Sequence, residues 1–444
     1  MSTNLNIMVF MKRFIDDKLV RWKEKKRRKP LIIRGTRQVG KTFAAVNFGK
    51  KHFERLAVID LERNPEWHQI FNGNLDAGRI RADLEIILNQ KITPGKTLLF
   101  LDEIQACPNA LKALRYFYEE IPKLHVIAAG SLLEFVMKEV SFPVGRLQFM
   151  HLHPMHFSEY LMAIGHDEAA NIVNSPPKPL SDAIHKFLCE ELRRYFFVGG
   201  MPESVKCYAE TRSMQESFEV QSEICETFRM DFGKYKPRTD WQCLNAVLSS
   251  AAQHVGNQLK YTRLAEGFSN PTIKKAFDLL CLAKVLVKLP SADPSGIPLE
   301  AGASPKRFKA ILADIGLMRY LSGMPVGLEY NKSGLLNIYR GAMAEQFVGQ
   351  EMLISQNNAL YYWARMKKSS SAEVDYLAAI NGKIYPIEIK SGVSGRLKSL
   401  HICLQKYPNC PKGIVFSENP YSELPEQRLK FIPLYFAGSA TRDI

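Results

Sequence analysis

LIIRGTRQVGKT, residues 31–42, is the stretch of this sequence that decides its fold. Its last eight residues fit the spacing G-x-x-x-x-G-K-[ST], between an apolar run and a helix-competent run, Phe43 to Lys51. Glycines at this spacing let backbone N–H groups turn inward around an anion, and the following helix points its positive end at the same place. A chance glycine loop is disfavoured because both flanking runs are of the required kind. The sequence therefore predicts a P-loop that binds a nucleoside triphosphate.

The predicted P-loop assigns roles to its residues. We expect ATP to be the nucleotide and Mg²⁺ to accompany it. Lys41 is expected to reach the β- and γ-phosphates, and the hydroxyl of Thr42 to bind Mg²⁺. The residues expected to contact the nucleotide are Gly35, Thr36, Arg37, Gln38, Val39, Gly40, Lys41 and Thr42.

An acidic pair follows a second apolar run. The run Thr97 to Leu101 leads directly into Asp102 and Glu103. Asp102 is expected to hold Mg²⁺ through water, and Glu103 to orient and deprotonate the attacking water. The alternative is an acidic strand end that caps the next helix, but the P-loop upstream favours a phosphoryl-transfer site.

Short apolar runs alternate with helix-like segments up to about residue 152. This alternation predicts a parallel sheet with helices on both faces, and phosphate then lies at the carboxyl ends of the strands. The predicted strands are Leu31–Ile33, Leu56–Leu61, Thr97–Leu101, Val126–Ala129 and Leu147–Leu152.

The chain of 444 residues is strongly basic, with a formal charge of +15 and a pI near 9.3. These values favour a polyanionic partner, with nucleic acid ahead of a membrane surface, although a generically basic surface has the same composition. Eight cysteines are scattered without a C-x-x-C pair or zinc spacing, which is typical of a reducing compartment. No signal peptide or spanning helix is visible, so we expect a cytoplasmic protein and no membrane partner.

The middle of the chain is helix-rich and then changes pattern at about Trp241. Helix-like runs at Leu244–His254, Tyr261–Glu266 and Asn270–Cys281 precede strand-like runs at Val285–Leu289 and Phe308–Ala313. Three helices and a hairpin predict a winged helix, with Thr272–Leu280 as its potential DNA-reading element. Winged helices also serve as pure protein contacts, so DNA contact stays open.

A second constellation lies near the C-terminus. Asn381-Gly382 between two β-like runs predicts a hairpin with a two-residue turn. This turn sets Ile380 opposite Lys383 and gives one apolar face, which includes Val374, Tyr376 and Ala378. It also sets Asp375 opposite Glu388, and Glu373 opposite Lys390.

Two opposed carboxylates are destabilising in a purely structural hairpin and suit a divalent-metal site. We expect Asp375 and Glu388 to hold Mg²⁺, with the Ile389 carbonyl as a further ligand, and Lys390 to orient a water. Glu345, in a helix-like run upstream, is a candidate third acid. The alternative is a solvent-facing hairpin with a Glu373–Lys390 ion pair.

These motifs together resemble a family of prokaryotic AAA+-type ATPases that carry a nuclease-like C-terminal domain of unknown function. The resemblance spans roughly residues 10–420 and rests on the order of its motifs. They are RGTRQVGKT, FLDEIQ, AAGSLLEF, GRLQFMHLHPMHFSEYL, VGGMPES, ADIGL, YRGAMAEQFV and EVDYLAAINGKIYPIEIKSG.

The resemblance implies an α/β multidomain chain. Its parts are an N-terminal helix and basic linker (1–29), an AAA+-type P-loop domain (30–155), a helical lid region (156–238), a winged helix (239–325) and a restriction-endonuclease-like domain (326–444). It also implies a strand between those of the P-loop and the acidic pair, whose polar end residue senses the γ-phosphate. Ser131 fits that role, although a helix N-cap fits equally. Arg146 matches an arginine that acts across a subunit interface, so a homo-oligomer is expected.

Two functions from different classes follow. The first is an Mg²⁺-dependent ATPase whose nucleotide state controls a nucleic-acid-directed, nuclease-like module. The second is an ATP-switched regulator that binds DNA or protein and whose nuclease-like fold is inert. A structural ATPase bound to a partner protein is a third alternative.

Overall fold

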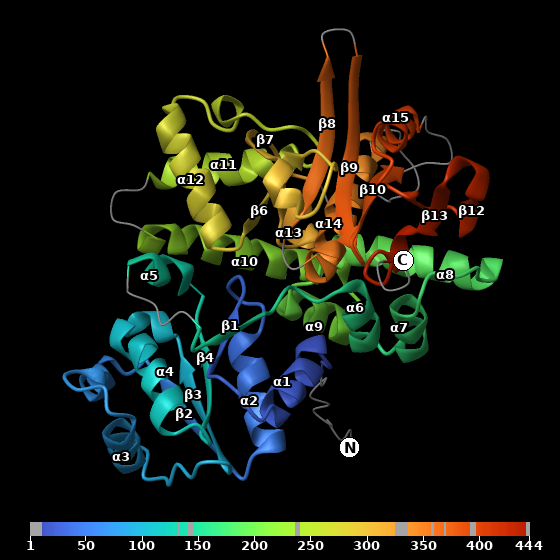
Figure 1. Ribbon diagram of the computed structural model, residues 1–444. Helices are drawn as coiled ribbons and strands as arrows, with labels where there is room; N and C mark the ends of the chain where they lie inside the picture. The colour runs from blue at the N-terminus through green and yellow to red at the C-terminus, as the bar shows by residue number, and fades with distance from the viewer. Residues whose placement is uncertain are drawn as a thin grey trace. The chain divides into compact units, whose positions relative to one another are not determined.

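A computed structural model describes residues 11–131, 133–139, 145–235, 240–324, 336–356, 359–367, 370–390 and 397–440. The chain divides into two compact units (Figure 1). The first unit comprises Lys12–His153 with Leu282–Lys284, and the second comprises Met1–Met11, Pro154–Cys281 and Val285–Ile444. Among the described helices, none has the length and apolar character needed to cross a membrane.

The first unit contains a five-stranded parallel sheet, as the sequence predicted. Its strand order is β2-β3-β4-β1-β5, so β4 lies between the P-loop strand β1 and the acidic strand β3. The strands are β1 (Leu31–Arg34), β2 (Arg55–Asp60), β3 (Thr97–Asp102), β4 (His125–Ala129) and β5 (Gln148–His151).

Helices cover this sheet (Figure 1). The interior strands β3 and β4 are buried throughout. Leu99 and Val126 pack in one core with Leu111 and Phe117 of α4. Trp22 of α1 packs against Phe48 of α2, with ring centroids 6.4 Å apart. The helices are α1 (Phe14–Glu24), α2 (Lys41–His52), α3 (Ala77–Ile87), α4 (Pro108–Glu120) and α5 (Leu133–Glu139).

The second unit begins with a helical region. Its helices are α6 (Phe157–Ala163), α7 (Asp167–Asn174), α8 (Asp182–Val198), α9 (Pro202–Thr211) and α10 (Met214–Tyr235). The elements that were predicted to form a winged helix follow. They are α11 (Trp241–Gln253), a 3₁₀ turn (Tyr261–Arg263), α12 (Asn270–Leu282), β6 (Leu286–Ala292) and β7 (Ala303–Leu312). In α12, Ile273, Ala276, Phe277 and Leu280 are buried while Lys274 and Lys275 are exposed, as its spacing predicted.

An eight-stranded mixed sheet organises the rest of this unit, with strand order β12-β13-β11-β10-β9-β8-β6-β7. The β6–β7 hairpin joins it through a parallel pairing of Ser291 with Tyr362 on β8. One sheet therefore crosses residue 325, where the sequence predicted a domain boundary. The remaining elements are α13 (Ile315–Leu321), α14 (Leu336–Ser355), β8 (Tyr361–Lys367), β9 (Ser370–Ile380), β10 (Lys383–Lys390), α15 (Lys398–Lys406), β11 (Gly413–Ser417), β12 (Ser422–Leu424) and β13 (Leu429–Pro433).

The predicted hairpin is β9–β10, and its register is confirmed from Ile380–Lys383 to Tyr376–Ile387. The predicted single apolar face is wrong. Val374 packs in the α15 core, whereas the hydroxyl of Tyr376 donates to the Glu345 carbonyl on α14 at 2.8 Å. The cause is a register shift where β9 pairs with β8, because an extra residue in a strand moves the following side chains to the other face.

Candidate nucleotide site and a C-terminal carboxylate cluster

Residues 35–42 form a tight loop between β1 and α2. A Cβ on Gly35 would lie 2.2 Å from the carbonyl oxygen of Leu152, so only glycine fits there. Gly40, at the N-cap of α2, has a φ of 89°, and Gln38 has a φ of 61°. These left-handed conformations turn the backbone into the concave form that binds anions at a helix N-terminus.

Lys41 is buried and folded back onto the loop. Its Nζ donates to the carbonyl oxygens of Gly35 (3.1 Å) and Thr36 (2.8 Å). Burial lowers the pKa of Lys41 to about 8, although Glu103 and Asp102 oppose this effect. The ammonium is thus held beside the loop by two neutral carbonyls, and a phosphate group would be a stronger partner.

Thr42 and Asp102 meet across the carboxyl edge of the sheet. The Thr42 hydroxyl donates to Asp102 Oδ2 at 2.8 Å, although Thr42 lies in the first turn of α2 and Asp102 is the last residue of β3. Burial raises the pKa of Asp102, and the hydrogen bond from Thr42 opposes this. A hydroxyl and a carboxylate in contact beside a phosphate loop are the oxygen ligands that suit Mg²⁺, so these residues fit the ion.

Glu103 leaves the end of β3 in a left-handed conformation with a φ of 45°. Such a backbone costs of order 1 kcal/mol or more in a non-glycine residue and is typical of functional sites. Its Oε2 accepts a hydrogen bond from Gln105 Nε2 at 2.6 Å. Gln105 was missed from the sequence because a glutamine two residues after an acid has no spacing signature.

Ser131 lies near this pair. A Cβ on Gly130 would meet Gln105 Oε1 at 2.1 Å, so the end of β4 touches the Gln105 amide directly. Ser131, the next residue, is buried. The structure thus brings Ser131 to the edge that carries Glu103 and the P-loop, and both of its predicted roles stay open.

Arg146 has a partner within its own unit. Its Nε lies 2.9 Å from Glu119 Oε1, which also accepts from Arg115 at 3.0 Å. The two arginines lower the pKa of Glu119, with Arg146 making the larger contribution. The role of Arg146 across a subunit interface stays a prediction.

Two further residues support the nucleotide site. Arg13, just before α1, is buried and donates to the carbonyls of Val39 (3.3 Å) and His153 (2.7 Å). It therefore links the P-loop to the segment that follows β5. Asp60 ends β2 in register with Asp102, and its charge helps to raise the pKa of Asp102. Neither contact has a local sequence signal, because both join segments far apart in the chain.

The second unit gathers carboxylates around one buried lysine. Lys309 on β7 is fully buried, and its Nζ lies 2.9 Å from Glu345 Oε1, 2.5 Å from Glu373 Oε1 and 3.6 Å from Asp375 Oδ1. Burial alone would lower the pKa of Lys309, but these carboxylates together hold it above its ordinary value. The sequence predicted Glu345 and Asp375 here but not the lysine.

Asp375 and Glu388, which were predicted to hold a metal ion together, each bind a different group of the protein. The Ile389 N–H donates to Asp375 Oδ2 at 2.8 Å, and Lys390 Nζ lies 2.6 Å from Glu388 Oε1. Glu373 accepts from Gln258 Nε2 at 2.7 Å, in addition to Lys309. Burial first, and Asp375 second, raise the pKa of Glu388, whose other oxygen is buried without a partner. Within the described ranges, no group of three or more His, Cys, Asp or Glu side chains is placed to hold a metal ion.

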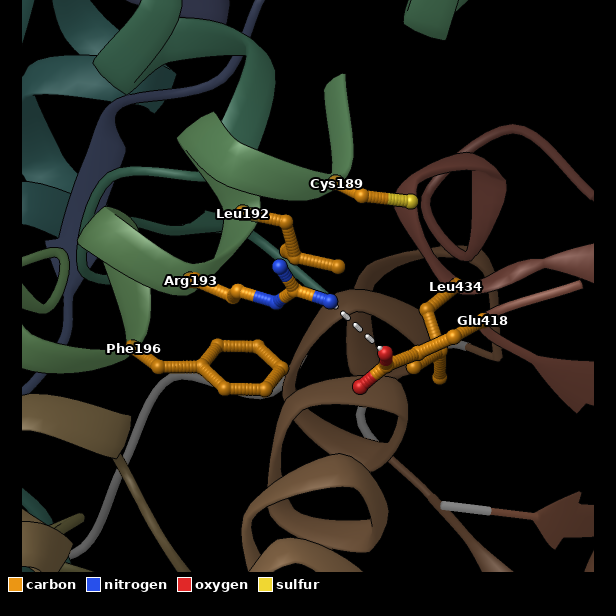
Figure 2. Close-up of a pocket in the computed structure, with 6 residues that line it drawn as sticks. All are labelled: Cys189, Leu192, Arg193, Phe196, Glu418 and Leu434. Atoms are coloured by element: carbon orange, nitrogen blue, oxygen red, sulfur yellow. Dashed lines mark hydrogen bonds and ion pairs between the residues drawn. The ribbon is translucent and has the colours of Figure 1, made fainter. Parts of the chain in front are cut away.

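A small pocket in the second unit does not support nucleophilic chemistry. Figure 2 shows Cys189 beside the ion pair of Arg193 and Glu418, whose atoms lie 3.0 Å apart. The cavity of about 10 Å³ has room for roughly one water. His185 Nε2 lies 3.8 Å from the Cys189 Sγ, but burial raises the pKa of this thiol to about 11. The thiol is therefore protonated and weakly nucleophilic at neutral pH.

An open concavity of about 600 Å³ lies along the mixed sheet. Arg307, Arg365 and Lys406 supply three cations to its wall, against one carboxylate from Asp293. The Asp293 carboxylate is already engaged, because the Tyr407 hydroxyl donates to it at 2.8 Å. The remaining wall is lined by Ala364, Ile402 and Gln405. This concavity carries a net positive charge of the kind that binds phosphate groups.

Family models match three separate segments of the chain. Residues 27–161 match the model of the AAA domain, in agreement with the P-loop and the strand order of the first unit. Residues 189–326 match a domain of unknown function, DUF8612, and residues 340–436 match another, DUF4143. No curated protein matches the chain.

Solved structures of low identity are similar over most of their own length. Aeropyrum pernix ORC1 in complex with DNA is 12% identical, covering 70% of this chain and 91% of that chain, with a TM-score of 0.29. The Thermotoga maritima RuvB Holliday junction branch migration motor is 14% identical, with coverages of 63% and 91% and a TM-score of 0.30. AMPPCP-bound DnaA from Aquifex aeolicus is 13% identical, with coverages of 60% and 84% and a TM-score of 0.28. The assignment of the first unit rests on its family model and geometry.

Proposed function

We propose that this protein is an Mg²⁺-dependent ATPase whose nucleotide state controls a nucleic-acid-directed module in its second unit. The observation that carries the ATPase part is the contact between Thr42 and Asp102 at 2.8 Å, directly beside the P-loop. A P-loop threonine and a strand-end aspartate are the two protein ligands of the ion in P-loop ATPases. The match of residues 27–161 to the AAA domain supports the same proposal.

Each residue then has a step to perform. Lys41 exchanges its two carbonyl partners for phosphate oxygens and neutralises charge that develops there. Thr42 and Asp102 would hold the Mg²⁺, and the ion would neutralise further charge on the phosphates. Glu103 orients a water and accepts its proton, for which its carboxylate must be released by Gln105. Ser131 contacts the γ-phosphate, and Arg146 completes the site of a neighbouring subunit.

The nucleic-acid part rests on charge. The chain has a formal charge of +15, and the concavity around Arg307, Arg365 and Lys406 concentrates cations on one wall. Phosphodiester backbones bind such surfaces through counterion release, without sequence readout. A second surface is the exposed side of α12 with Lys274 and Lys275, the DNA-reading element of the proposed winged helix. We favour the concavity because it gathers three cations around a hollow.

The competing function is an ATP-switched regulator whose second unit contacts a protein. Nucleotide binding alone would then suffice, and neither surface would bind nucleic acid. Measuring the affinity of the full chain for a DNA and an RNA oligonucleotide at two salt concentrations separates the two. Salt-sensitive binding supports the nucleic-acid proposal, and no binding at low salt supports the regulator.

The ATPase proposal is tested on wild-type protein and Lys41→Ala. We expect the wild type to bind ATP and to release phosphate only when Mg²⁺ is present, with EDTA as the control. Lys41→Ala should lose binding and turnover while keeping the melting temperature within a few degrees, because its buried ammonium contacts only two carbonyls. A Lys41→Ala protein that binds and hydrolyses ATP normally would refute the proposal.

A further inference from the structure

A single ammonium lies at the centre of the carboxylate cluster in the second unit. Lys309 Nζ is within 4 Å of oxygens from Glu345, Glu373 and Asp375. These acids come from α14 and β9, whereas Lys309 comes from the edge strand β7, which is separated from β9 by β8 and β6 in the sheet order. Burying a lysine is costly unless it is paired, so this placement is held by the acids themselves.

Two of the three carboxylates around Lys309 accept a further hydrogen bond from the protein. Glu373 takes a second bond from Gln258 at 2.7 Å, and Asp375 takes one from the Ile389 N–H at 2.8 Å. The other oxygen of Glu345 faces the backbone of Gly256, where an added Cβ would lie 2.9 Å from it. Two other segments of the chain, residues 256–258 and β10, therefore contact the acids around this ammonium, while the Glu373 side chain stays 33% exposed.

The same acids are those that a divalent cation would need. Mg²⁺ demands about six oxygen ligands at about 2.0–2.1 Å, and a carboxylate that serves an ammonium is not free for it. Two cations a few ångströms apart also repel each other strongly in a buried site. Lys309 and a divalent ion therefore compete for Asp375 and Glu345.

We propose that Lys309 is an internal cation that takes the place of a divalent metal in this cluster, so that the second unit binds its partner without metal-dependent cleavage. The inference is independent of the ATPase site, which lies in the first unit. It decides between the two states of the nuclease-like module. The acids Glu345, Asp375 and Glu388 are present, but Lys309 already pairs with the first two and Lys390 with the third. The basic concavity beside it keeps its capacity to bind phosphate groups.

The test measures Mn²⁺ binding to the full chain without nucleotide, by electron paramagnetic resonance. The proteins are the wild type, Asp375→Asn, Lys309→Met, Lys309→Arg as the charge-keeping control, and Lys309→Met combined with Asp375→Asn. We expect Lys309→Met to gain one Mn²⁺ site that is at least about tenfold tighter than any Asp375-dependent site of the wild type. The combined variant should lose this site, and Lys309→Arg should not gain it.

Two outcomes overturn the proposal. One is a wild-type protein whose Mn²⁺ affinity falls in Asp375→Asn and does not improve in Lys309→Met. The other concerns folding, because Lys309→Met leaves the buried Glu345 and the part-buried Glu373 and Asp375 without this cation. If it folds only when Mn²⁺ is added, and unfolds with EDTA, the ion has replaced the ammonium as proposed. If Lys309→Met folds under neither condition, the double variant Lys309→Met with Glu373→Gln replaces it, because this variant carries one negative charge fewer. A folded double variant that binds no Mn²⁺ would refute the inference.

Discussion

The Gln105 amide nitrogen, Nε2, donates a hydrogen bond of 2.6 Å to Glu103 Oε2. The oxygen that accepts this bond is one of the two that a general base would use. An amide donor at this distance fixes the direction in which that oxygen points. The Glu103 carboxylate is thus held by a neighbour two residues away, at the end of the strand that carries Asp102.

Replacing Glu103 by glutamine should separate binding from turnover. The variant keeps the shape of the site, so ATP affinity should change little, whereas loss of a general base should slow phosphate release by about 10²–10⁴-fold. Gln105→Ala is the companion variant and should raise basal turnover, because it frees the carboxylate. Binding is followed with a fluorescent ATP analogue and turnover by phosphate release. Equal turnover in Glu103→Gln and wild type would exclude Glu103 as the base.

The lowered pKa of Lys41, about 8, predicts a pH dependence of ATP affinity. Phosphate contacts favour the charged ammonium, so the pKa of Lys41 must rise when ATP binds. Affinity should therefore be flat below about pH 7 and fall by up to about tenfold per unit as the pH rises above 8. Binding above pH 8 should be accompanied by proton uptake, which calorimetry in buffers of different ionisation enthalpy detects.

Lys41→Arg provides the control for this titration. A guanidinium does not lose its proton in this range, so its affinity curve should be flat whatever its absolute level. A wild-type affinity that is constant between pH 7 and pH 9.5 would show that Lys41 stays charged in the free protein.

Arg146 and Arg115 form a matched pair, since both contact Glu119 Oε1, at 2.9 Å and 3.0 Å. Replacing either by alanine should change the melting temperature little, because the pair is exposed. Only Arg146→Ala should lower ATP turnover. Mixing Arg146→Ala with Glu103→Gln should restore part of the activity if each supplies the other's missing group across an interface. Equal turnover in Arg146→Ala and Arg115→Ala would assign Arg146 to this surface network alone.

The basic concavity predicts a specific loss of nucleic-acid affinity. Arg307→Ala and Arg365→Ala should each weaken binding and reduce the slope of log affinity against log salt by about one for each phosphate that the protein no longer neutralises. Lys383→Ala, at the exposed β9–β10 turn, is the control and should leave the slope unchanged. The combined variant of Lys274 and Lys275 to alanine tests the α12 surface instead. A larger loss of affinity there than at Arg307 would move the interface to α12.

Most of the nucleotide site could be predicted from the sequence because its parts are local patterns. The P-loop is one continuous stretch, and the five strands are recognisable as apolar runs, two of which end in Asp102 or in Gly130-Ser131. What the sequence did not reveal are contacts between distant segments. Arg13 reaches Val39 and His153, and no spacing rule connects a residue before α1 to the end of β5.

Only the part of the C-terminal cluster that depends on a local pattern could be predicted from the sequence. The turn at Asn381-Gly382 set the register of β9 and β10, and this part of the prediction is confirmed. The register shift between β8 and β9 depends on the partner strand and moves Val374 and Tyr376 to opposite sides. Lys309 lies 66 residues before Asp375 in the sequence (375 − 309), in a hairpin predicted to belong to another domain.

The shared sheet has a consequence for how this chain can vary among its relatives. The matched segments end at residue 326 and resume at residue 340, so they divide Lys309 from Glu345, Glu373 and Asp375. A neutral residue at position 309 would leave Glu345, Glu373 and Asp375 without the cation that they share, and neutral residues at two of these positions would leave the buried lysine with one carboxylate. Substitutions on the two sides of this division should therefore occur together, and a gene that exchanged one segment alone would encode a protein with an unbalanced interior.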